Sequence, residues 1–375
     1  MPDRNSNLCH KRSSFESLLT QALTHPATLG TLVGRDWSFL IHEARRAGLL
    51  ARIHDLLAKE QLLDAIPIQP RMHLDAARII AENERRIVHW ELDRLKRALD
   101  GTGVPIVLLK GAAYVALNLP NSRGRISSDV DILVPKEKIQ VVESALLEHG
   151  WEHIKLDEYD QYYYRTWSHE LPPLRHRERK TILDVHHTIL PLTGRLQPNA
   201  GKLLEAALPV DGISFKVLAP PDMVLHSAAH AFQDGDLQRG LRDLVDLDDL
   251  LRHFGSEPAF WNNLVVRAKE LDLWRPLYYG LRYSRLTLQT PIPDRVLTAT
   301  RDWGPIWPAA WLMDKLVISV LGPSWPEGRD VRSSIAARLL YARSMWLRMP
   351  PWLLALHLAH KIVTNSKWPR KTSPK

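Results

Sequence analysis

The sequence predicts an α+β fold, in which a small mixed sheet lies between helical segments on both sides. Apolar residues between Met72 and Leu99 recur at close to helical spacing. Two short apolar runs, 104–109 and 129–134, then have the length and composition of buried strands. Helical patterns return at Pro220 and continue to about residue 364. A strand-containing core inside an otherwise helical chain follows from these three observations.

Composition places the chain among ordinary globular proteins. It has 375 residues, of which 45% are hydrophobic and 25% are charged, enough for a sizeable core. The formal charge of +8 suits polyanionic partners without selecting one. A single cysteine, Cys9, excludes a disulfide framework within the chain. We expect a cytoplasmic protein with no membrane span, because no apolar run approaches twenty residues.

The helical segment before the sheet has clear boundaries in the sequence. Pro67 and Pro70 separate the 72–99 pattern from an earlier helical stretch, and Gly101 and Gly103 would end it. The predicted organisation along the chain is disorder over 1–12, a helical segment over 13–103, a sheet core over 104–218, a helical domain over 219–364 and a basic tail over 365–375.

Within the core, the expected elements follow one another closely. Gly103 and Gly111 bound the first strand, and Pro135 and Gly150 stand where a helix begins and ends. The expected order is a strand at 104–109, a helix at 111–119, a polar turn at 120–125, a strand at 129–134, a helix at 135–149, and strands at 151–156, 162–167 and 181–186.

Two carboxylates head the second strand. In extended backbone, residues two apart point to the same face, so Asp129 and Asp131 present their side chains together while Val130 points away. Two carboxylates held close together repel, and a divalent cation relieves the repulsion. Hard oxygen ligands suit Mg²⁺, or Mn²⁺ in its place.

An Asp-x-Asp pair can also do no more than cap a strand or turn. Here the pair heads a strongly apolar strand, where charge is least expected. It also follows a strand, Lys110, Gly111 and a helix, and a glycine at such a junction lets backbone N–H groups approach a phosphate. This context favours a functional site.

Four segments of the core form a recognisable set of motifs: Leu109-Lys110-Gly111, Arg125, Asp129-Val-Asp131-Ile-Leu-Val134 and Leu183-Asp184-Val-His186. Beyond the sheet core, His226, His230 and the stretch 241–246 extend the set. Together these motifs resemble a known family, the bacterial uncharacterised nucleotidyltransferases of the polymerase-beta-like superfamily. The resemblance covers roughly residues 37–255.

The resemblance implies transfer of a nucleoside monophosphate from an NTP to an acceptor hydroxyl. Asp129 and Asp131 would hold Mg²⁺ on the triphosphate, and Asp184 would complete a metal position or act as general base. Ala112 stands where the wider superfamily prefers glycine or serine, so no hydroxyl reaches phosphate there. The residues implied in nucleotide binding are Lys110, Gly111, Arg123 and Arg125.

Three histidines are candidates for the substrate side of the site. His226 and His230 lie four apart on a predicted helix and share a face. A zinc site would need a third ligand and usually a glutamate between them, whereas serine and alanines stand there. We expect instead either a substrate-positioning role or a satisfied polar face toward the cleft. His186 shares the face of Asp184 on its strand.

Competing interpretations remain open from sequence alone. A non-catalytic module with this fold could bind nucleotide, RNA or a protein, but it would not need three carboxylates. A haloacid-dehalogenase-type phosphatase would require Thr or Val where Leu133 stands. A glycosyltransferase would place a doubly wound region before the Asp-x-Asp.

The acidic stretch 234–249 is either a second metal cluster or a solvated helix face paired with Arg239 and Arg242. The acceptor, whether small molecule, peptide, protein or RNA, is undetermined.

Overall fold

The computed structural model describes residues 17–126, 129–154, 158–233, 240–322 and 331–366, with side chains described up to residue 360. The predicted disorder at 1–12 and most of the predicted tail lie outside this part of the chain. The helices are α1 (Leu18–Thr24), α2 (Gly34–Arg46), α3 (Leu50–Lys59), α4 (Ile68–Leu99), α5 (Lys110–Ala116), α6 (Ile139–Glu148), α7 (Glu158–Trp167), α8 (Ala200–Glu205), α9 (Pro220–Gln233), α10 (Gly240–Phe254), α11 (Phe260–Glu270), α12 (Trp274–Leu288), α13 (Asp294–Thr300), α14 (Ala309–Leu321), α15 (Val331–Arg348) and α16 (Pro351–Ser366).

The strands form one mixed sheet, so the predicted α+β class is confirmed. Their order across the sheet is β3-β4-β5-β2-β1-β7-β6. β2 runs parallel to β5 and antiparallel to β1, which in turn runs parallel to β7. The strands are β1 (Val107–Leu109), β2 (Asp129–Leu133), β3 (Trp151–His153), β4 (Leu174–His176), β5 (Ile182–His186), β6 (Leu208–Pro209) and β7 (Lys216–Val217).

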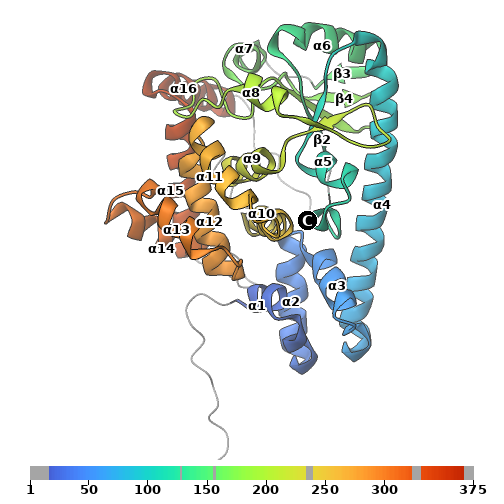
Figure 1. Ribbon diagram of the computed structural model, residues 1–375, viewed down its shortest axis with the longest axis vertical. Coiled ribbons are helices and arrows are strands. Elements are labelled where there is room, and N and C mark those ends of the chain that lie inside the picture. The colour runs from blue at the N-terminus through green and yellow to red at the C-terminus, as the bar shows by residue number, and fades with distance from the viewer. Residues whose placement is uncertain (1–16, 127–128, 155–157, 234–239, 323–330, 367–375) are drawn as a thin grey trace, which may run out of the picture.

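Helix α4 connects the two ends of the molecule. Its 32 residues span ~48 Å at 1.5 Å per residue, and it runs along one side from α3 to α6 (Figure 1). Its buried stripe, from Leu74 through Leu92 to Leu99, explains the helical spacing seen in the sequence. Gly103 follows in the left-handed region at φ 62°, where glycine carries no Cβ penalty.

One predicted strand is wrong. Residues 162–167, rich in aromatic and β-branched side chains that favour strands, lie within helix α7. Tyr163 and Trp167 are four apart on α7, so they share a face, and they pack against His357 and Trp352 of α16 at ring distances of 5.7 and 6.2 Å. Tertiary packing of the aromatic face therefore overrides strand propensity. The short strands β4, β6 and β7 were not predicted.

Two apolar clusters hold the fold together. One joins the sheet and the second half of α4 to α9, α11 and parts of α10 and α12. The other joins α1, α2 and α3 to α10, α12 and α14. Because α9, α10 and α12 contribute to both clusters, they fix the sheet relative to the N-terminal helices. None of the described helices is long and apolar enough to cross a membrane.

Candidate functional site

The pairing of β2 with β5 brings the predicted carboxylates together. The two strands run parallel, and their register sets Asp131 opposite Asp184 and Asp129 opposite Ile182. Paired residues of neighbouring strands share a face, as do residues two apart on one strand. Asp129, Asp131 and Asp184 therefore lie on the same face of the sheet. Val130 and Ile132 point the other way into the apolar core.

Asp131 is buried between two basic groups. Its side chain is 6% exposed, and its Oδ1 lies 3.0 Å from the Lys110 Nζ and 3.0 Å from the His186 Nε2. Burial alone would raise the pKa of this carboxyl. The Lys110 ammonium and His186 outweigh burial and hold the pKa of Asp131 well below 3.8. Asp131 is therefore ionised at neutral pH.

Asp184 has the opposite character. Its Oδ1 is buried and makes no hydrogen bond. Burial, followed by the negative charges of Glu170 and Asp131, raises the pKa of Asp184 to about 7. The neighbouring cations thus do not balance all of the carboxylates on this face of the sheet, and Asp184 holds a proton in part of the molecules near neutral pH.

Lys110 reaches Asp131 from a strained junction. It is the first residue of α5, directly after β1, and has φ 43° although it is not glycine. Residues in this left-handed region cost about 1 kcal/mol or more, and such strain gathers at functional sites. Gly111 and Ala112 are buried in the following turn of α5. The predicted Lys-Gly junction therefore lies beside Asp131, in the middle of β2.

Arg125 and Arg123, both predicted to contact phosphates, differ in their surroundings. The Arg125 Nε donates to the Asp246 Oδ2 of α10 at 3.0 Å, and its guanidinium lies over the Tyr114 ring. Arg123 is exposed and lines a pocket shared by α3, α4 and the turn at 120–125. The sequence did not foresee the Arg125–Asp246 pair.

The family is decided by a comparison of sequence patterns. The sequence profile described as "Uncharacterised nucleotidyltransferase" matches residues 34–289. The chain belongs to this family. The match runs from the start of α2 to the end of α12, so it includes every candidate site residue, and it ends before α13.

Comparison with solved structures finds a distant likeness to a nucleotidyltransferase-like protein. That crystal structure is of an antigenic nucleotidyltransferase-like protein from Paracoccidioides brasiliensis, with 13% sequence identity and a TM-score of 0.27. The likeness covers 58% of this chain and 96% of that one. Among curated proteins, nothing matches.

In this nucleotidyltransferase-family protein, His226 of α9 lies close enough to Lys110 and His186 for their charges to act on it. His226 is 4% exposed. Burial, then the charges of Lys110, His230 and His186, hold the pKa of His226 well below 6.5, so it is neutral. Within the described residues, no three-ligand metal group includes His226 or His230.

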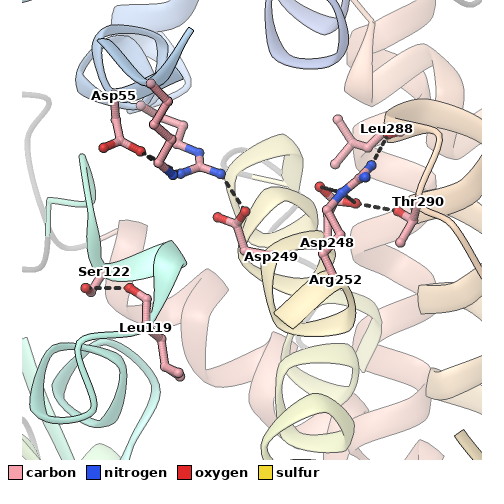
Figure 2. A network of polar contacts seen from close by, with 10 residues as sticks. Asp55, Leu119, Ser122, Asp248, Asp249, Arg252, Leu288 and Thr290 are labelled. Carbon is pink, nitrogen blue, oxygen red and sulfur yellow. Dashed lines mark hydrogen bonds and ion pairs between the residues drawn. The ribbon is translucent and has the colours of Figure 1, made fainter. Parts of the chain in front are cut away.

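Within the described residues 240–249, the acidic stretch is only partly the solvated helix face that the sequence suggested, and no three-ligand metal group is found there. Asp246 and Asp249 of α10 are buried, and Asp249 pairs with Arg52 of α3. Figure 2 shows Asp249 pointing toward α3, near Asp55, while Asp248 faces Arg252 and Thr290. Burial raises the pKa of Asp249 to about 7, although Arg52 opposes it. Residues 234–239, including Arg239, lie outside the described part of the chain.

Sequence reasoning missed His169 and Glu170. The backbone of 169–171 runs beside β5: the His187 N–H donates to the His169 carbonyl and the Leu171 N–H donates to the Val185 carbonyl. Among the described residues, His169, Glu170 and His186 are the one group whose three ligand atoms all lie within 4.8 Å of one another. A His-Glu dipeptide was the only signal, and nothing in the sequence connected it to β5.

Proposed function

We propose that the protein is a Mg²⁺-dependent nucleotidyltransferase that transfers a nucleoside monophosphate from an NTP to an acceptor hydroxyl. The observation that carries the proposal is the β2–β5 register, which sets Asp129, Asp131 and Asp184 on one face in a chain of a nucleotidyltransferase family. Carboxylates on adjoining strands are the usual way to hold a divalent cation against phosphate oxygens.

The donor set fits a hard divalent cation. All three side chains offer oxygen, and the buried Asp184 Oδ1 makes no hydrogen bond. Both basic contacts of Asp131 fall on Oδ1, which leaves Oδ2 for a cation. Mg²⁺, or Mn²⁺, held by Asp129, Asp131 and Asp184 would supply charge neutralisation on the triphosphate and on the attacking oxygen.

The chain's own residues would then orient the reaction. Lys110 places an ammonium group beside Asp131, where it can contact a phosphate oxygen as the NTP enters. His186 fixes the position of the Asp131 carboxylate. Asp184, the third carboxylate on this face, would complete the cation's position on the acceptor side, where the ion would lower the pKa of the attacking hydroxyl.

The proposed chemistry allows several classes of acceptor and favours one cellular compartment. A small molecule, a peptide, a protein and an RNA all offer hydroxyl groups that this chemistry can use. The supply of NTPs favours action in the cytoplasm. Arg123, exposed beside the pocket between α3 and α4, is suited to meet an anionic part of either substrate.

The test is transfer of label from each α-³²P NTP, with Mg²⁺ or Mn²⁺ and a cell extract as the source of acceptors. Wild type should label an acceptor, and the Asp129→Asn/Asp131→Asn double variant should not. Asp93→Asn, which removes an exposed carboxylate on α4, is the matched control and should retain transfer. Nucleotide binding without transfer by wild type would favour the alternative, a non-catalytic binding module.

A further inference from the structure

A second ligand cluster lies beside the carboxylate site, and the proposed reaction uses only one of its three residues, His186, which positions Asp131. Glu170 Oε2 is 3.3 Å from His186 Nδ1 and 3.8 Å from His169 Nε2. The geometry points to a site for a divalent transition ion, such as Zn²⁺, held by His169, Glu170 and His186. This site differs from the Asp129–Asp131–Asp184 set in both residues and donor chemistry.

The spacing of the three ligand atoms suits such an ion. Metal–ligand bonds of 2.0–2.1 Å in a tetrahedral site place neighbouring ligand atoms ~3.3–3.4 Å apart. The Glu170–His186 separation already has this value, the Glu170–His169 separation is longer by less than half an ångström, and all three ligand atoms lie within 4.8 Å of one another. Small side-chain rotations would bring all three atoms into coordination distance.

His186 gives an independent indication of a ligand. Its side chain is 3% exposed, and its Nδ1 makes no hydrogen bond although Glu170 lies close. The Glu170 carboxylate, 3.3 Å away, does not meet hydrogen-bond geometry, and coordination to an ion would satisfy this buried nitrogen. The other ring nitrogen, Nε2, contacts the Asp131 carboxylate at 3.0 Å. Metal-bound histidines usually make this contact, which fixes the ring and strengthens the ligand.

The backbone holds the ligands in place before any ion binds. Glu170 forms a bridge with His186, and the hydrogen bonds of Leu171 and His187 fasten the segment 169–171 to β5 on either side of it. Ligands on paired backbone keep their geometry better than ligands on a free loop. The ion would in turn join this segment to the strand that carries Asp184.

The donor set selects the class of ion. Two imidazoles and one carboxylate suit zinc and its neighbours, whereas Mg²⁺ prefers oxygen ligands and retains its water. Three protein ligands also leave one coordination position for water or a substrate atom, as in catalytic rather than structural zinc sites. Because Asp131 contacts His186, the ion would also stabilise the position of a carboxylate assigned to the Mg²⁺ site.

The experiment measures ion binding to the full chain without nucleotide, so its result is independent of the proposed transfer reaction. The protein is stripped with a chelator and titrated with Zn²⁺ against a chromogenic competitor, and with Co²⁺ while its visible absorption is recorded. We expect one tight ion per chain and a Co²⁺ spectrum of nitrogen and oxygen ligation. His169→Gln and Glu170→Gln, whose side chains are 13% and 18% exposed, should each weaken binding at least ~100-fold.

The controls separate this site from its surroundings. His153→Gln removes a histidine that also lies close to a glutamate, with Nε2 2.7 Å from Glu143 Oε1, and also has a buried Nδ1 that makes no hydrogen bond. The residue belongs to no three-ligand group in the described chain, so the variant should bind like wild type. Unchanged binding in both His169→Gln and Glu170→Gln would overturn the proposal. Loss of ion binding in Asp129→Asn but not in His169→Gln or Glu170→Gln would assign the ion to the carboxylates instead. Absence of stoichiometric ion binding by wild type would reject the site.

Discussion

Asp184 offers the sharpest test of the electrostatics of the carboxylate site. Its pKa is raised to about 7 from an ordinary value of 3.8 because burial and nearby carboxylates disfavour the ionised form. Asp184→Asn keeps the shape of the side chain and removes its charge. In metal-free protein this substitution should stabilise the fold at alkaline pH, even though it should abolish nucleotide transfer.

The size of the effect follows from proton linkage. Between the two pKa values the folded chain holds a proton that the unfolded chain has released, so the free energy of unfolding falls by about 1.4 kcal/mol per pH unit. This loss in the free energy of unfolding is absent below pH 3.8 and complete above pH 7. The stability of Asp184→Asn relative to wild type should therefore rise by about 2–3 kcal/mol from pH 5 to pH 8 and then level off. Solvent near the partly exposed side chain reduces this figure.

Urea unfolding at pH 5, 7 and 8 in the presence of EDTA measures the difference. Asp100→Asn, which removes an exposed negative charge at the end of α4, controls for net charge alone. A difference between Asp184→Asn and wild type that is independent of pH would refute the reasoning. Saturating Mg²⁺ should reverse the order of stability, because only wild type has the third carboxylate to hold the cation.

Two further predictions concern the scaffold, both measured as free energies of unfolding in urea. Gly124→Ala should cost more than ~2 kcal/mol, because φ is +70° there and an added Cβ would lie 2.7 Å from the Ala51 backbone. The control Gly103→Ala, at φ +62° in open space, should cost only ~1 kcal/mol. Equal costs would show that the close approach to Ala51 is unimportant. Arg267→Ala should cost about 3–5 kcal/mol, because it leaves the fully buried Asp222 without its bidentate partner. The control Arg97→Ala, in an exposed ion pair, should cost under ~1 kcal/mol. A small loss in Arg267→Ala would show that Asp222 is neutral or solvated.

Local patterns were enough to predict the site's main strand. Asp129 and Asp131 share a face because side chains alternate along any extended segment, and Val130 and Ile132 then bury opposite them. The helix α4 and the apolar strand β1 followed from periodicity and glycine boundaries in the same way. The strand prediction for residues 162–167 failed because strand propensity is a weak preference, and packing of Tyr163 and Trp167 against α16 outweighs it.

The partners of the site residues needed the folded chain. Arg125 meets Asp246 across 121 positions, and His186 meets Asp131 across 55. Glu170 reaches His186 only because the segment 169–171 pairs with β5. Such contacts depend on which strands become neighbours and in what register, and no local pattern encodes that choice.

Local patterns along the chain were sufficient to predict the α+β class, the face on which Asp129 and Asp131 lie, and the motifs that the family profile matches. The folded chain was needed to learn that Asp131 is ionised between Lys110 and His186 and that the pKa of Asp184 is raised to about 7. The physical reason is that alternation and amphipathic spacing are properties of a few consecutive residues. Burial and charge–charge interaction depend on distances between segments that only the packed sheet and helices bring together.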